Sequence, residues 1–415
     1  MKGIFYQNKR SIFLNSLLFL VAFSLPFSLA FNSLSIILFS LFCLSFFKVE
    51  NIKTLLNYKQ VYFYFILFYL FQIFSYSYSY DKNLALDNLI KNIVYLILPI
   101  AFVSVKMFLN KNSFNALFNG LLMSIILSLI KVYWHILRSI FTSTFELKYF
   151  LREGFVENGI FKIHVPYFSM LIVFLIVYVV KIEFLRNKNW NLVLKTSILL
   201  LLIVSLFLLS GLMSVFLFVL FCIYLVFKNP CNRSLKIKLF IIIFSIITAT
   251  FIFIKNMEKL EGVRGAENIF FRVQNLMNSD SYVRIENWKS VTEVISENFF
   301  FGVGVDGGIT ELLKKREPLT EPFVNKHNAH NTLLETMLRY GFFGLVIFCL
   351  IIFHLISISI KTMNYYFSWF LIIFLLSSLT ESYLQRQIGL IFFVFFSLFF
   401  YTANITKITK KLVHK

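Results

Sequence analysis

Two histidine–asparagine pairs lie three residues apart in the stretch KHNAHNTLLETMLRYGFFGLVIF, which runs from Lys326 to Phe348. A histidine in this position can exchange a proton near neutral pH, which makes His330 a candidate general base. At helical spacing His327, His330 and Leu334 would share one face. The alternative is a polar helix start at a membrane interface, with an asparagine as its cap. Periodicity alone leaves both interpretations open.

The elements that must position these residues are strongly apolar. Of the 415 residues, 59% are hydrophobic, 55 are Phe and only 14% are charged. A soluble domain is nearer half apolar and a quarter charged, so the composition indicates a membrane protein. The net charge of +20 lies mainly in short links between apolar runs. Such links orient a chain in the bilayer, whereas a nucleic-acid binder gathers its charge on one face.

About twelve apolar runs are long enough to cross a bilayer. Every second link between them is basic and poor in acids, which predicts that both termini are cytoplasmic. The acids gather in the alternate links. We therefore predict an all-α fold of twelve transmembrane helices, near residues 12–29, 31–47, 60–76, 91–106, 114–135, 164–182, 191–209, 212–227, 237–254, 342–360, 365–380 and 387–403.

One outer segment, from Lys255 to about Arg339, is long enough to form helices of its own. Long segments of mixed polarity between spans are usually functional. Asp280 to Glu297 predicts an amphipathic helix, and Phe299–Gly308 a glycine-rich bend. The apolar face of that helix would comprise Val283, Trp288, Val291 and Ile295.

These elements divide the chain into three parts. Residues 1–254 would hold spans one to nine, 255–341 the large periplasmic loop, and 342–415 the last three spans with a basic cytoplasmic tail. Gly341 and Gly344 would let another backbone come close at the membrane boundary. The outer segments show no P-loop and no metal-ligand spacing, so we predict neither a metal nor another cofactor.

The histidine motif resembles a family signature. His330-Asn331, nine residues and then Gly341-Phe-Phe-Gly344 is similar to the His-[Asn/Ser/Gln]-x9-Gly-x-x-Gly signature of the O-antigen ligase and polymerase superfamily. The stretch Ser281–Gly308 resembles the Arg-x3-Trp helix and the Gly-Val-Gly turn of that family, and it lies in the expected outer loop. Two shorter stretches are similar to segments common in these proteins, Ile163–Met170 and Leu379–Gly389.

The resemblance implies transfer of a glycan from undecaprenyl diphosphate to an acceptor hydroxyl, such as one on lipid A-core, at the periplasmic face of the bacterial inner membrane. His330 would be the base. Arg284 matches the family's loop arginine and would bind the diphosphate, because a guanidinium offers a rigid fork of donors. The alternative for Arg284 is a solvated helix residue paired with Glu286 or Asp280. The other residues expected to bind donor or acceptor are His327, Asn331, Glu381 and Arg386.

One departure from the family pattern concerns the second cation for the diphosphate. Ligases often carry a Ser-Arg pair after the seventh span, whereas Leu208–Ser214 contains no arginine here. Our preferred substitute is Arg386, followed by Arg339 and Arg152. Arg386 has an alternative interpretation as a partner of Glu381 that anchors an outer turn.

Three functions compete for this sequence. The first is a metal-independent, O-antigen ligase-type glycosyltransferase that uses a lipid diphosphate donor. The second is a repeat-unit polymerase of the same superfamily, which needs the same base and the same diphosphate site. The third, of another class, is a polysaccharide flippase, which would carry polar residues deep in its spans and short outer loops. The clean apolar runs and the single large outer loop favour the transferases.

Overall fold

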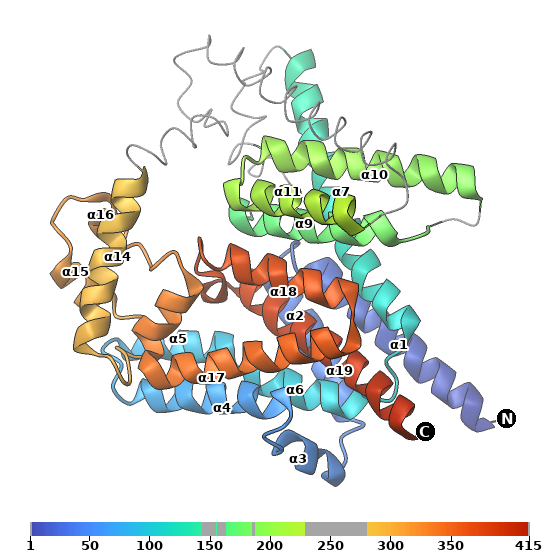
Figure 1. Cartoon of the computed structure of the whole chain (residues 1–415), viewed down its shortest axis with the longest axis horizontal. Coiled ribbons are helices and arrows are strands. Elements are labelled where there is room, and N and C mark those ends of the chain that lie inside the picture. Colours follow the sequence, from blue (N-terminus) through green and yellow to red (C-terminus); the bar gives the residue numbers. More distant parts are fainter. Residues whose placement is uncertain (1, 143–154, 156–162, 185–186, 229–279, 414–415) are drawn as a thin grey trace. The chain divides into compact units, whose positions relative to one another are not determined.

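The computed structural model describes residues 2–142, 155, 163–184, 187–228 and 280–413, and the regular elements in these ranges are all helices. Figure 1 shows their arrangement along the chain. The predicted all-α class is therefore confirmed for the described residues. The ninth apolar run, 237–254, lies outside them, as do residues 255–279 of the large outer segment.

Within the described residues, five helical stretches are long and apolar enough to cross a membrane. A sixth is possible if the bent pair α2 (Leu29–Leu44) and α3 (Val49–Leu55), at 118°, forms one span. Four shorter apolar helices, α4 (Val61–Tyr76), α9 (Val165–Lys181), α11 (Leu212–Lys228) and α18 (Tyr365–Ser377), coincide with other predicted runs. The twelve-span arrangement remains a prediction. The five long stretches are Lys82–Val105, which joins α5 (Lys82–Asn92) and α6 (Val94–Val105), α7 (Lys111–Phe141), α10 (Lys188–Leu208), α17 (Thr332–Thr362) and Gln387–Ile405 within α19 (Gln387–Val413).

The chain divides into two compact units. The first comprises Met1–Met123 and Tyr282–Lys415, and the second comprises Ser124–Ser281. In the second unit, α9 packs against both α10 and α11, and its residues are buried almost without interruption. A helix that is apolar on all sides suits such a central position.

The first unit is built around α6, which packs against α2, α4 and α19. Helix α1 (Lys2–Ser24) packs on α2, and α4 runs alongside α17 (Figure 1). Phe39, Phe102 and Phe395 meet where α2, α6 and α19 converge, with ring centroids 5.0–5.2 Å apart. Tilted and edge-on aromatic pairs add to the free energy gained from packing alone. Part of the high Phe content thus forms the contact between these helices.

A break in α17 at Gly341 joins this helix to the glycine-rich bend. Gly341 has φ 60° and ψ −163°, so the helical hydrogen bonds stop there. The freed groups pair with the bend instead: Val303 N–H donates to the Leu338 carbonyl (2.9 Å), and Phe342 N–H donates to the Phe299 carbonyl (2.8 Å). Two further bonds of the same kind follow, Gly304 N–H to Arg339 carbonyl and Phe343 N–H to Phe300 carbonyl.

The crossing of these two segments leaves no room for side chains. A Cβ on Gly341 would lie 2.4 Å from the Phe300 carbonyl group, and a Cβ on Gly302 would lie 2.5 Å from the Arg339 backbone. The close backbone approach expected from the motif is therefore present at Gly341. At Gly344 the nearest atoms belong to side chains, those of Tyr340 and Phe71.

We predict that Gly341→Ala destabilises the protein strongly. A non-glycine residue in this conformation costs about 1–3 kcal/mol, and the new methyl group must also displace the Phe300 backbone. The midpoint of thermal unfolding in detergent should fall by several degrees. Val346→Ala, at an exposed position of the same helix, serves as the control. A midpoint for Gly341→Ala equal to that of the control would contradict the prediction.

Candidate active site

His330 lies in a turn before α17 and not within the helix. Its φ of 46° is left-handed, and its N–H donates to Asn328 Oδ1 at 2.9 Å. Asn331 is the N-cap: its side-chain oxygen accepts from the N–H groups of Leu333 (2.9 Å) and Leu334 (3.1 Å). The predicted helical face of His327, His330 and Leu334 is therefore wrong. Asn331 caps the N-terminus of α17, so the helix begins at Thr332, with an asparagine cap as in the alternative interpretation.

His330 faces the carboxylate of Glu381. The Nδ1 atom of His330 lies 3.5 Å from Glu381 Oε2, and the two side chains are 33% and 10% exposed. A carboxylate at Nδ1 favours the tautomer with its proton on that nitrogen, which leaves Nε2 unprotonated and available as a base. It also stabilises the imidazolium that forms when the base takes a proton. The sequence thus placed both residues at the site, and the structure brings them together.

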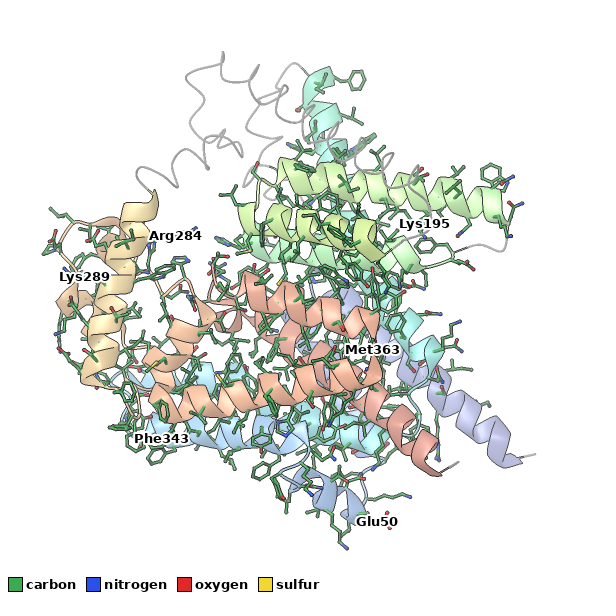
Figure 2. All side chains as sticks on the ribbon, viewed as in Figure 1. Glu50, Lys195, Arg284, Lys289, Phe343 and Met363 are labelled. Atoms are coloured by element: carbon green, nitrogen blue, oxygen red, sulfur yellow. The ribbon has the colours of Figure 1, made fainter. Side chains whose placement is uncertain are left out.

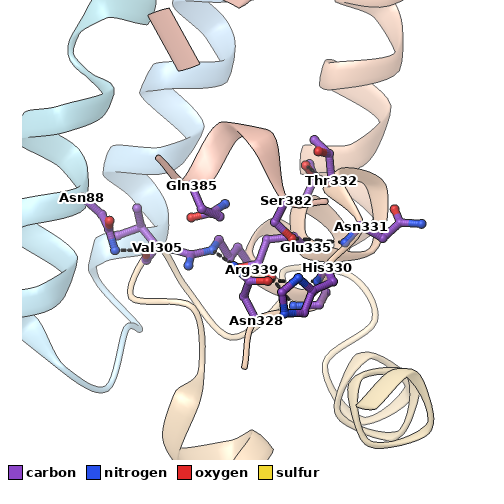
Figure 3. Close-up of polar contacts among 12 residues, drawn as sticks. Asn88, Val305, Asn328, His330, Asn331, Thr332, Glu335, Arg339, Ser382 and Gln385 are labelled. Atoms are coloured by element: carbon purple, nitrogen blue, oxygen red, sulfur yellow. Dashed lines mark hydrogen bonds and ion pairs between the residues drawn. The ribbon is translucent and has the colours of Figure 1, made fainter. Parts of the chain in front are cut away.

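The loop that carries Glu381 is bound to the first turn of α17 (Figure 3). Thr332 Oγ1 donates to the Glu381 carbonyl at 2.9 Å and accepts from Tyr383 N–H at 3.1 Å. Asn331 N–H donates to Ser382 Oγ at 3.2 Å. The N-terminus of the helix and the Glu381 loop therefore hold the imidazole and the carboxylate in a fixed relation.

His327 is the close neighbour of His330. Their rings are perpendicular, with centroids 5.1 Å apart, and His327 Nε2 lies 4.0 Å from Glu321 Oε1. Burial lowers the pKa of His327, and the neighbouring His330 lowers it further. His327 is therefore neutral at neutral pH, so it does not add a positive charge beside the candidate base.

Helix α14 (Asp280–Glu297) holds the backbone that leads to His330. The structure gives this helix the predicted bounds. Asn287 Nδ2 donates to the Asn328 carbonyl (2.8 Å), and Trp288 Nε1 donates to the Ala329 carbonyl (2.9 Å). Trp288, the tryptophan of the Arg-x3-Trp pattern, therefore holds the backbone of the histidine segment, residues 327–331, in place. The buried face also includes Val291 and Val294, which share an apolar cluster with Ala329.

Arg316 is a buried cation that the sequence did not single out. It follows α15 (Ile309–Lys315), is 4% exposed, and donates to Asn287 Oδ1 at 2.6 Å and to the His327 carbonyl at 2.7 Å. It also donates to the carbonyl of Pro322 in α16 (Glu321–Val324) at 2.9 Å. One guanidinium thus ties α14 to the segment before His330. Its neighbours in the sequence are charged, which is typical of a solvated run and hides this role.

Arg339, one of the substitutes considered for the second cation, already has a partner. Its Nε donates to Glu335 Oε1 at 2.7 Å, and its Nη1 donates to the Val305 carbonyl at 2.6 Å. Glu335 Oε2 accepts from Ala329 N–H at 2.9 Å. Both side chains are at most 10% exposed. This buried pair links the histidine segment to the glycine-rich bend, and removing either member would leave an uncompensated charge.

The remaining predicted cations lie in different surroundings. Arg284 is half-buried on α14, in the turn before Asn287 and Trp288, and Figure 2 labels it together with Lys289 on the same helix. Among the described side chains, Arg284 forms no ion pair with Glu286. Arg386 is exposed and directly follows the short 3-10 helix η2 (Tyr383–Gln385). Arg152 lies outside the described residues.

His164 precedes α9 in the second unit, where its side chain makes no cap hydrogen bond and is exposed. Within the ranges described, no three His, Cys, Asp or Glu side chains gather in an arrangement that would hold a metal ion.

The described residues form helices, several of them apolar enough to span a membrane, and a histidine–carboxylate pair lies at the start of one of these. These features indicate a membrane protein with a candidate proton-transfer site. Residues 197–349 match the family model described as O-antigen ligase. This match supports the O-antigen ligase superfamily for the chain, as the resemblance of the histidine motif implied, and with it a glycosyltransferase-like enzyme. The matched region includes α14, the glycine-rich bend, His330 and Gly341, whereas Glu381 lies beyond it. No curated protein matches the chain.

We predict that acid destabilises the protein partly through His327. Its pKa is lowered in the folded state, so folding is penalised when the pH falls from the usual histidine value, about 6.5, through the lowered value. His327→Gln removes this penalty and should lose less stability than wild type between about pH 7 and pH 5. Thermal unfolding midpoints at both pH values provide the measurement. Asn325→Gln, at an exposed neighbour that does not titrate, should follow wild type, and a parallel response of His327→Gln would refute the prediction.

Proposed function

We propose that this protein transfers a glycan from undecaprenyl diphosphate to an acceptor hydroxyl, as an O-antigen ligase does. The proposal rests chiefly on the contact between His330 and Glu381, which supplies an oriented base at the start of an apolar span. The superfamily match supports the same class of reaction. The acceptor would be lipid A-core or a similar glycan hydroxyl.

The chemistry requires one proton transfer and one displacement. His330 Nε2 takes the proton of the acceptor hydroxyl, while Glu381 offsets the charge on the imidazolium. The acceptor oxygen forms a bond to the anomeric carbon as the bond from that carbon to the diphosphate oxygen breaks. The electron pair leaves with undecaprenyl diphosphate. Because the bond between the sugar and the diphosphate of the donor is already activated, the step needs neither ATP nor a metal ion.

Arg284 is the proposed ligand for the departing diphosphate. It lies on α14 one turn from Asn287 and Trp288, the two residues that hold the backbone at Asn328 and Ala329. A guanidinium forms short, charge-assisted hydrogen bonds to phosphate oxygens and can bind two at once. Its charge would stabilise the leaving group as the donor bond breaks.

The proposed location is the bacterial inner membrane, with twelve spans, both termini in the cytoplasm and the site facing the periplasm. The basic links support this orientation. Helix α3, beside Lys48 and at the cytoplasmic end of the second predicted span, exposes Val49 and Ile52 together with Lys53. Such a mixture of basic and apolar groups suits a membrane surface.

We expect His330→Ala to reduce glycan transfer by a factor of about 10² to 10⁴, because the hydroxyl loses its base. Glu381→Gln should reduce it by about 10- to 100-fold, since the imidazole keeps its place but loses the oriented charge. Arg284→Ala should nearly abolish transfer. The measurement is formation of the glycan-bearing acceptor in membranes that contain equal amounts of each variant.

His135→Ala and Lys289→Ala are the matched controls, a histidine in α7 and an exposed lysine one turn after Arg284. Both should retain wild-type transfer. Normal glycan profiles in His330→Ala and Arg284→Ala would eliminate the mechanism.

A deletion strain separates ligase from polymerase. We expect loss of the gene to leave long glycan chains on undecaprenyl diphosphate and none on lipid A-core, because polymerisation continues without the final transfer. Single repeats on lipid A-core would identify a polymerase instead, since ligation would then continue without chain growth. Electrophoresis of lipopolysaccharide, together with analysis of lipid-linked glycans, distinguishes the two patterns.

A further inference from the structure

An ionisable residue lies inside one of the candidate membrane spans of the first unit. Lys91 is in the last turn of α5, within the apolar stretch Lys82–Val105, and is half-buried. Charged side chains in such positions are costly, and those that occur usually serve a substrate path or a partner. Neither the histidine motif nor the chemistry described above makes use of Lys91.

Neutral oxygen atoms hold the Lys91 ammonium. Nζ donates to Asn88 Oδ1 at 2.7 Å and to the Gln385 carbonyl at 2.8 Å. An ammonium has three N–H donors, so one remains for another acceptor. Within the described part of the chain, Lys91 forms no ion pair with a carboxylate. Its hydrogen-bond partners are therefore dipoles, while the charges of Arg339 and Glu335 act on it without direct contact.

These contacts connect Lys91 to the candidate active site. Asn88 donates to the Val305 carbonyl at 3.0 Å, the same oxygen that accepts from Arg339 (Figure 3). Gln385 belongs to the loop that carries Glu381. Asp306 is another buried acid beside this network, and its carboxylate accepts from Asp81 N–H. Among the described side chains it forms no ion pair with Lys91 or Arg339.

The loop 381–385 relates the base to Lys91. Glu381 contacts His330 at one end of the loop, and the Gln385 carbonyl accepts from Lys91 at the other. Four residues span at most about 14 Å, and η2 shortens this distance. A displacement at an anomeric carbon needs the base on the side of the incoming hydroxyl and a positive charge near the departing group. Two groups joined by one short loop are near enough to each other for that arrangement.

We propose that Lys91 binds the diphosphate of the lipid-linked donor and supplies the second cation that Leu208–Ser214 lacks. This inference rests on the proposed function. Arg339 is committed to Glu335, and a compact ammonium with an open donor suits a phosphate oxygen. A phosphate on the acceptor would present the same chemistry, so the test must separate donor from acceptor.

The test uses the full-length protein in liposomes with an undecaprenyl-diphosphate-linked glycan and its acceptor. Lys91→Gln should raise the KM for the donor by about 10- to 100-fold and leave the KM for the acceptor unchanged, because one charge-assisted contact is lost. Inorganic pyrophosphate should inhibit this variant less than wild type. Glutamine can still donate to Asn88 and Gln385, so the supporting contacts can persist. Lys289→Gln is the matched control, at an exposed lysine.

A second measurement uses the wild-type protein alone. Inorganic pyrophosphate should protect Lys91 from acetylation by acetic anhydride, as read by mass spectrometry, while labelling of Lys289 stays constant. This readout remains decisive if Lys91→Gln does not fold. Equal labelling of Lys91 with and without pyrophosphate would overturn the inference.

The kinetic outcomes separate the two proposals. An unchanged donor KM in a folded Lys91→Gln variant, or an increase confined to the acceptor KM, refutes the role of Lys91 and leaves the transfer reaction intact. No transfer by wild type, or full activity in His330→Ala, refutes the reaction itself.

Discussion

The site depends on the capture of a short non-helical segment by buried polar side chains. Residues 327–331 enter α17 through a left-handed His330, a conformation that the backbone does not hold by itself. Asn287 and Trp288 bind carbonyl groups of this segment, and Glu335 binds the N–H of Ala329. Without these contacts nothing in the segment would hold the His330 imidazole against Glu381.

The polar groups that make this capture possible are expensive to bury, and each is met by a partner. Arg316 is surrounded by carbonyl and amide oxygens, and Arg339 by a carboxylate and a carbonyl. Buried polar networks of this kind are strongly stabilising only when their members are satisfied. Residues 280–339 therefore do more than connect two helices, because their buried charges fix the backbone that carries the candidate base.

Much of this arrangement was predictable from the sequence. The apolar period gave the bounds of α14, and the two glycines of the histidine motif indicated a close backbone approach, which is present at Gly341. The helical face of His327 and His330 was not found, because Asn331 caps the N-terminus of α17 and the helix begins after them. Arg316 and Lys91 were missed for a different reason. Several of their partners are main-chain carbonyl groups, which leave no periodic signal, and Asn287 and Gln385 lie far from them in the sequence.

The crossing at Gly302 and Gly341 has a mechanical consequence. Four main-chain hydrogen bonds join the bend at 299–304 to residues 338–343 of α17. Because Gly302 and Gly341 have no side chain, the two backbone segments can approach this closely. The bend and the first turns of α17 are consequently held together as one element. The imidazole, which immediately precedes α17, would therefore keep a constant position relative to these turns.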